Sequence, residues 1–233
     1  MHNAILALRQ RELALSTKPF AARGGKVKRC QQCLLPVPDC MCAHTPAPMA
    51  DAAFLFLMAK GECYKPSNTG RLIADVVKTN FAFTWQRLEP QQALLDLLND
   101  ARYAPIIIFP HEYAEPERCI HNLDSVPDSR TPLFIMLDGT WREARRMFRK
   151  SEYLQHLPVL GVRPVAQSDY LLREAAHDYQ LCTAEVGVEV LKLAGDTASA
   201  DALTRYFKVF RRSYLKGKPH LTDKNEQAEN GLE

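Results

Sequence analysis

The 233-residue sequence lacks any long apolar run. Its most apolar stretches, AAFLFLMA at 52–59 and APIIIFP at 104–110, are far shorter than the roughly 18 residues that a membrane-spanning helix needs. The N-terminal stretch MHNAILALRQRELALSTKPF mixes apolar and charged residues and lacks the continuous apolar segment of a secretory signal. These absences predict a cytoplasmic protein without membrane-spanning helices.

Two nucleotide-binding signatures are also missing. Neither GxxxxGK[ST] nor GxGxxG occurs, so P-loop hydrolysis and Rossmann-type dinucleotide binding lack their motifs. Acidic residues are scarce near both ends of the chain: residues 1–29 hold seven Lys or Arg against one Glu, and residues 205–218 hold six against no acidic residue. Because the net charge of the whole chain is only +3, this charge separation favours a polyanionic partner.

Cysteine is concentrated in one place. Four of the seven cysteines lie close together as Cys30, Cys33, Cys40 and Cys42. Thiolates with this spacing in a reducing compartment predict a tetrahedral Zn²⁺ site, and because protein fills all four positions the metal would be structural. Two alternatives stay open, a redox pair of Cys30 and Cys33 or a site in which His44 replaces one thiolate. The spacing does not distinguish zinc from iron.

Beyond this cluster, short apolar runs alternate with amphipathic stretches, which is typical of a mostly parallel sheet flanked by helices. We expect strands at 52–59, 81–87, 104–109, 132–137 and 157–162. We expect helices at 69–79, 90–100, 113–121, 140–150, 183–194 and 199–215. Residues 122–131 are rich in turn formers and predict a loop. We divide the chain into a basic N-terminal segment with the zinc knuckle (1–50), a main α/β domain (51–218) and a flexible acidic tail (219–233).

The segment PLFIMLDGTWREARRMFRKS places a carboxylate where a buried strand ends. Asp138 follows the apolar run, and the carboxyl edge of an open α/β sheet is where ligands bind. Thr140 and Glu143 have the spacing of a capping box, so the next helix does not need Asp138 as its cap. We therefore favour a functional role for Asp138. The alternative is a carboxylate that only accepts N–H bonds near the positive end of that helix.

The same predicted helix carries four arginines on one face. They are Arg142, Arg145, Arg146 and Arg149, with Lys150 close by and only Glu143 to offset them. Because this face begins at the expected ligand edge, we interpret it as a phosphate-binding surface rather than a merely solvated one. In the last helix, Arg211 and Arg212 are among cations interleaved with aromatic residues, which suits RNA contact and base stacking. Inward packing of the aromatic side chains would give the same pattern.

Residues 65–72, KPSNTGRL, form a second candidate anion site after the first strand. Turn formers and hydroxyl groups there can present backbone N–H groups to an anion, with Lys65 and Arg71 on either side. The alternative is that Ser67 or Thr69 only caps the helix that follows.

In chain order, the four cysteines, KPSNTGRL, Asp138-Gly139-Thr140-Trp141, YLLREA and CTAEV resemble the DTW-domain family, in particular its bacterial tRNA-uridine aminocarboxypropyltransferases. The resemblance runs from about residue 5 to 218 and implies a SPOUT-like α/β fold related to the knotted methyltransferases. It also implies bound zinc and S-adenosylmethionine as co-substrate. The implied reaction transfers the 3-amino-3-carboxypropyl group to N3 of a uridine in the tRNA variable loop and releases methylthioadenosine. In one departure, this chain reads Lys60-Gly61-Glu62 where many relatives carry a His before the glutamate.

The residue patterns and the resemblance together predict three sets of residues besides the expected metal ligands. The catalytic set is Asp138, as general base or as the group that orients uracil, with Thr140 and Trp141. The donor-binding set is Ser67, Asn68, Thr69, Arg71, Leu137, Arg173, Thr183 and Glu185. For the first four, binding of an RNA phosphate in place of the donor carboxylate stays open, and the positions of Thr183 and Glu185 alone indicate helix capping. The tRNA-binding set is Lys65, Arg142, Arg145, Arg146, Arg149, Arg211 and Arg212. Two other functions stay open, a SPOUT-type RNA methyltransferase or a zinc-containing RNA-binding module without catalysis. We expect a monomer.

Overall fold

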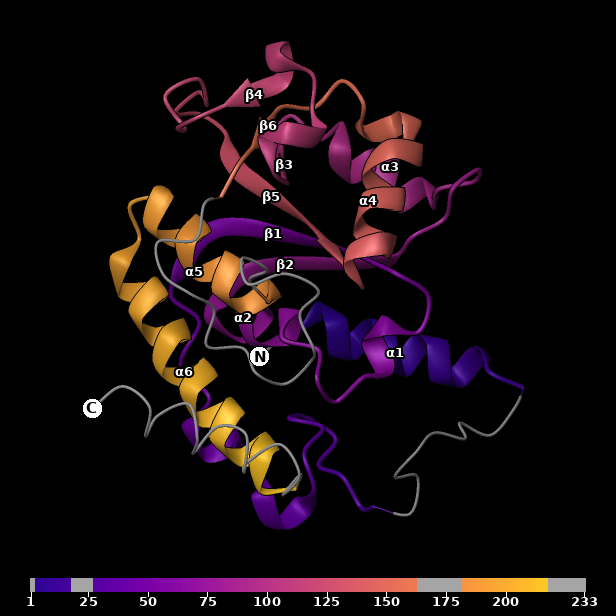
Figure 1. Cartoon of the computed structure of the whole chain (residues 1–233), viewed down its shortest axis with the longest axis vertical. Helices are drawn as coiled ribbons and strands as arrows, with labels where there is room; N and C mark the ends of the chain where they lie inside the picture. The colour runs from indigo at the N-terminus through magenta and orange to yellow at the C-terminus, as the bar shows by residue number, and fades with distance from the viewer. Residues whose placement is uncertain (1–2, 18–26, 163–181, 218–233) are drawn as a thin grey trace.

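A computed structural model of the chain describes residues 3–17, 27–162 and 182–217, and Figure 1 shows how the elements are arranged. Within these residues six strands form one sheet in the order β2-β1-β5-β3-β6-β4, and every neighbouring pair is parallel. The strands are β1 (Ala50–Met58), β2 (Val77–Thr84), β3 (Tyr103–Ile108), β4 (Cys119–Ile120), β5 (Thr131–Asp138) and β6 (Val159–Leu160). This sheet confirms the predicted parallel α/β architecture.

Helices cover both faces of the sheet. They are α1 (Ala4–Leu15), α2 (Gly70–Val76), α3 (Gln92–Leu98), α4 (Trp141–Lys150), α5 (Thr183–Leu193) and α6 (Thr197–Lys216). Successive side chains of β1 point to opposite faces. Phe54 and Phe56 pack with residues of α1, α2, α5 and α6, whereas Leu55 and Leu57 pack with residues of α3 and α4. No helix in the described part of the chain is long and apolar enough to cross a membrane.

The first helix, α1, was not among the elements expected from the sequence. Its start is capped by Asn3, whose side-chain oxygen accepts hydrogen bonds from the N–H groups of Ile5 and Leu6 at 3.1 and 3.2 Å. Ile5 and Leu8 are buried in the core cluster on one face of the sheet. The helix therefore depends on an apolar surface that only the folded chain provides.

The helix expected at 113–121 is wrong. This stretch contains two 3₁₀ turns, His111–Tyr113 and Pro116–Arg118, followed by β4. Pro116 has no N–H group and its ring clashes with a preceding helical turn, so a continuous α-helix cannot pass through it. The chain instead makes two separate turns at this point.

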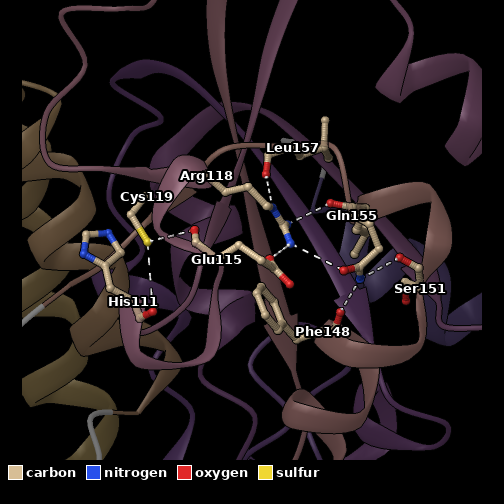
Figure 2. A network of polar contacts seen from close by, with 9 residues as sticks. His111, Glu115, Arg118, Cys119, Phe148, Ser151, Gln155 and Leu157 are labelled. Atoms are coloured by element: carbon tan, nitrogen blue, oxygen red, sulfur yellow. Dashed lines mark hydrogen bonds and ion pairs between the residues drawn. The ribbon is translucent and has the colours of Figure 1, made fainter.

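The Arg118 side chain anchors this segment to its neighbours. Its Nε donates to the main-chain carbonyl of Leu157 at 3.0 Å, as Figure 2 shows. Its Nη2 donates to Leu154 O, also at 3.0 Å. The neighbouring Gln155 amide donates to Phe148 O in α4 at 2.8 Å. Hydrogen bonds between a side chain and distant carbonyls produce no periodic pattern in the sequence. The apolar pattern of 113–121 therefore wrongly predicted a helix.

Two other boundaries differ from expectation because α2 passes directly into β2. The helix expected at 69–79 ends at Val76, and the strand expected at 81–87 already begins at Val77, which pairs with Ala50 of β1. The YLLREA segment with Arg173 and the predicted tail 219–233 lie outside the described residues. The SPOUT-like topology with its knot, and the division into three segments, stay predictions.

Candidate functional site

The carboxyl ends of β1 and β5 lie side by side. Met58 of β1 is in register with Asp138 of β5, and the Ala59 N–H donates to the Asp138 carbonyl at 2.8 Å. The loops that follow both strands therefore start from the same edge of the sheet. In parallel α/β sheets this edge is where loops and helix N-termini converge on a ligand.

The Asp138 side chain is held by residues from two other segments. It is 3% exposed. Its Oδ2 accepts a hydrogen bond from Asn68 Nδ2 at 2.7 Å, and its Oδ1 accepts one from Thr183 Oγ1 at 3.0 Å. Both donors stabilise the negatively charged carboxylate and fix its direction. Three segments of the chain that are far apart in sequence thus meet at this one group.

Gly70 allows α2 to start against the Asp138 carboxylate. A Cβ atom at this position would lie 2.7 Å from Asp138 Oδ2, closer than such atoms approach one another. The absence of a side chain is therefore required for the close approach of backbone and carboxylate. This explains the glycine within KPSNTGRL without any role in a phosphate-binding loop.

The Asn68 side chain bonds to the backbone at the start of α2. Its Oδ1 accepts a hydrogen bond from Arg71 N at 3.2 Å. Thr69 makes no capping bond with its side chain, and its Oγ1 accepts from Ala184 N in α5 at 3.2 Å. The Thr69 side chain therefore does not cap α2, and it ties the start of α2 to the start of α5.

Arg71 is buried rather than exposed to a polyanion. Its residue surface is 1% exposed, and its guanidinium carbon lies 4.9 Å from the centre of the Phe210 ring. Two of its nitrogens, Nε and Nη1, have no hydrogen-bond partner. Burial lowers the pKa of Arg71 from its ordinary value. A guanidinium at this depth suits a small ligand better than the backbone of an RNA.

The start of α5 places Thr183 and Glu185, two members of the expected donor-binding set, near Asp138 and α2. Thr183 contacts Asp138 as described above. Glu185 forms the capping interaction expected at a helix start, since its Oε2 accepts from Cys182 N at 2.8 Å. Leu137 is half-buried next to Asp138, and Arg173 lies outside the described residues.

Glu62 belongs to this cluster and was missed in the sequence. It is 1% exposed and lies in the 3₁₀ turn Glu62–Tyr64 after β1. Its Oε1 lies 3.4 Å from Asn68 Nδ2, and its Oε2 is paired with Lys65 Nζ. The signal was present, because an acidic residue shortly after a buried strand is the same pattern that pointed to Asp138. Lys65, expected to bind RNA, therefore has its charge compensated within the protein.

Thr140 and Trp141 are explained by the start of α4. Thr140 Oγ1 accepts from Glu143 N, and Glu143 accepts from the Thr140 backbone N–H, which confirms the predicted capping box. Partial burial opposes ionisation of Glu143, but the donors of Thr140 lower its pKa below the ordinary value. Trp141 stacks on Phe109 with ring centres 5.3 Å apart. Both residues hold α4 in place next to Asp138.

The arginine face of α4 is narrower than expected. Arg142, Arg146 and Arg149 are exposed, and the Arg146 guanidinium lies 5.6 Å from the Trp85 ring centre. Arg145 instead points to Tyr113, with 4.8 Å between its guanidinium carbon and the ring centre. Three of the four arginines therefore form the exposed surface, which we call the α4 arginine surface.

The aromatic residues of α6 do not form a stacking platform. Tyr206, Phe207 and Phe210 are buried in the core, so the expectation of base stacking on them is wrong and inward packing is correct. An amphipathic helix hides its aromatic stripe when a neighbouring surface is available. Arg212 is exposed and Arg211 half-buried, so the cations of this helix stay accessible to a partner.

The four clustered cysteines converge as a metal site requires. Their Sγ atoms all lie within 4.8 Å of one another, with 3.5 Å between Cys30 and Cys42 and 3.7 Å between Cys33 and Cys40. Sulfurs around tetrahedral zinc are about 3.8 Å apart, given Zn–S bonds of about 2.3 Å. His44 is not part of the cluster that the described residues form. The four-thiolate set therefore fits zinc better than the His44 alternative does.

The surroundings of this cluster also favour a bound cation. Burial raises the pKa of the Cys42 thiol, and its hydrogen bond with the Cys30 sulfur raises it further, so the Cys42 thiolate is unfavourable there. A divalent cation would remove this penalty. The cluster lies beside the C-terminal end of α6 in Figure 1, where Pro36 approaches Gly217.

Comparison with known families gives one match that spans most of the chain. A model described as the DTW domain matches residues 27–215, which include the four cysteines, the loop with Asn68 and the end of β5. No solved structure matches the chain.

Proposed function

Because the chain belongs to the DTW-domain family, we propose that it is a tRNA-modifying transferase. The reaction we propose moves the 3-amino-3-carboxypropyl group from S-adenosylmethionine to N3 of a uridine in the tRNA variable loop. The observation that carries the proposal is the Asp138 carboxylate at the carboxyl edge of the sheet, held by Asn68 and Thr183 next to the α4 arginine surface. A SPOUT-like topology is part of the same proposal.

The proposed chemistry needs one base and good alignment. Asp138 accepts the N3 proton of uridine or orients the ring while the proton leaves. The N3 electron pair then attacks the γ-carbon of the methionyl chain, the bond from that carbon to the sulfonium breaks, and methylthioadenosine departs. General base catalysis contributes about 10² to 10⁴ in rate, and alignment of nucleophile and leaving group contributes further. A carboxylate fixed by two donors is suited to both tasks.

The remaining residues divide by position. Thr69, Thr183 and the buried Arg71 lie around the start of α2 and α5, where they can hold the polar end of the donor. The α4 arginine surface faces outward and suits the phosphates of tRNA. The four cysteines would hold zinc, which supplies structural cross-linking of the segment before β1 and takes no part in the transfer.

Product analysis tests the proposed reaction. Purified protein is incubated with unmodified tRNA and S-adenosylmethionine labelled in its methionyl chain, and the small products are separated. We expect methylthioadenosine together with label in tRNA. Adenosylhomocysteine would indicate methyl transfer instead, and the absence of both would indicate an RNA-binding protein without this catalysis.

The α4 arginine surface has a separate test. Replacing Arg142, Arg146 and Arg149 by Glu should weaken tRNA binding and flatten its dependence on salt. Each lost phosphate contact removes about 0.7 to 0.9 from the slope of log K against log salt, so the triple variant should lose about 2 to 3. Binding is measured by fluorescence anisotropy over a range of salt concentrations.

A matched control keeps the change in net charge the same. Lys78, Arg102 and Lys192 are exposed and belong to β2, to the turn before β3 and to α5. Replacing these three by Glu should leave the salt dependence close to that of the wild type. Equal losses in both triple variants would show that α4 is not a specific contact surface.

A further inference from the structure

Two buried carboxylates lie on either side of one amide group. Glu62 and Asp138 are nearly inaccessible to solvent, and Asn68 Nδ2 lies 3.4 Å from Glu62 Oε1 and 2.7 Å from Asp138 Oδ2. An amide nitrogen has two hydrogens, so a single Asn68 side chain can donate one to each carboxylate. Glu62 lies in the turn after β1, and Asp138 is the last residue of β5. The Asn68 amide connects the two carboxylates at the carboxyl edge of the sheet.

The direction of the Asn68 amide is determined by its partners. Its Oδ1 accepts from the Arg71 N–H at 3.2 Å, while its nitrogen faces two acceptors. A rotated amide would place an oxygen against both carboxylates and a donor against a donor, which removes three favourable contacts. Without Glu62, the observed direction of the Asn68 amide would be favoured by one contact fewer.

Glu62 is itself stabilised where it lies. Gly61 adopts a positive φ of 82°, a conformation that glycine adopts without strain, and this turn directs the chain into the 3₁₀ turn that carries Glu62. Lys65, one turn later, pairs with Glu62 Oε2 and is 42% exposed. The Lys65 ammonium offsets part of the cost of burying this carboxylate. Glu62 therefore faces Asn68 as a hydrogen-bond acceptor while Lys65 compensates its charge.

From these contacts we propose that Glu62 is a positioning residue, which holds the Asn68 amide in the direction that orients Asp138 for proton abstraction. The proposal rests on the proposed function, and it adds a residue that acts on Asp138 through Asn68. Glu62 does not touch the substrates in this arrangement. Its removal should therefore affect the rate of the chemical step more than the binding of tRNA or donor.

Kinetics of single variants give the first test. Glu62→Ala should lower kcat by about 10²-fold, because misplacement of a reacting group by about 1 Å has an effect of this size, while KM for both substrates changes little. Glu62→Gln keeps an oxygen that can accept from Asn68 and should restore most of the lost rate. A rise in KM at unchanged kcat, or a Gln variant as slow as the Ala variant, would overturn the positioning role.

A double-mutant cycle tests the route through Asn68. In an Asn68→Ala background the Glu62→Ala substitution should lower kcat by less than about two-fold, since the group that carries its effect is already gone. If the fall in kcat of the double variant equals the product of the two single falls, Glu62 acts independently of Asn68, which contradicts the proposal. Unfolding in urea is measured for all four proteins, so that loss of folded protein is not mistaken for loss of rate.

The position of Asp138 provides a readout that does not depend on the reaction. Crystal structures of the wild type and of Glu62→Ala should show a shifted Asn68 side chain and a displaced Asp138 carboxylate in the variant. An Asp138 side chain in the same place in both would overturn the inference. If the wild type yields no methylthioadenosine, the proposed function fails, whereas this structural comparison still decides whether Glu62 positions Asp138.

Discussion

Asp138→Asn lowers kcat for aminocarboxypropyl transfer by about 10² to 10⁴-fold, the range expected when a general base is lost. The amide has nearly the same shape as the carboxylate and can still accept from Thr183 or Asn68, but it has no oxygen basic enough to take the N3 proton. KM for tRNA and S-adenosylmethionine should change little, because the lost interaction acts in the transition state. This is the largest kinetic effect that we expect from a single substitution.

Methylthioadenosine release under saturating substrates measures the effect, and thermal unfolding shows whether the variant is folded. The matched control is Asp128→Asn, which changes the same functional group in the exposed loop before β5 and should leave kcat as in the wild type. Full turnover by Asp138→Asn would remove Asp138 from the chemistry, and with it the main support for the proposed mechanism.

Removal of the metal should have the largest effect on stability. The wild type should contain one zinc ion per chain, and a strong chelator or Cys33→Ser should lower the free energy of unfolding by at least about 3 kcal/mol. For a chain of this size such a loss corresponds to a fall of about 6 to 12 °C in Tm. The reason is that Cys33 and Met41 are part of the core that includes Phe210, so loss of the cross-link loosens the packing against α6.

The measurement combines metal analysis with calorimetry before and after chelation, and zinc added back should restore Tm. The control substitution is Cys119→Ser, a half-buried cysteine outside the cluster, which should keep both the zinc and the Tm. Iron in place of zinc would correct the identity of the metal. A metal-free protein with a disulfide among these cysteines would contradict the metal site and favour the redox alternative.

Features that depend on neighbours in the sequence were predicted well. The capping box of Thr140 and Glu143, the strand that ends at Asp138 and the four-cysteine cluster all involve residues within a dozen positions of one another. Their local spacing alone brings the groups together, because one turn of helix or one tight loop is enough. Local patterns failed for the helix expected at 113–121. A proline interrupts that stretch, and the Arg118 side chain bonds to a distant carbonyl, so the chain forms turns there.

The amino-acid sequence by itself determined the class of fold, the four-cysteine cluster and the aspartate at the strand end, because apolar periodicity and short-range spacing are properties of the chain before it folds. Only the tertiary structure decided which groups face Asp138. Asn68 and Thr183 are 70 and 45 residues away from it in sequence, and Glu62 is connected to it by the Asn68 amide. The same packing buried Arg71 over Phe210 and turned Arg145 toward Tyr113. Hydrogen bonds and burial of this kind depend on the register of distant strands and helices, which no local pattern encodes.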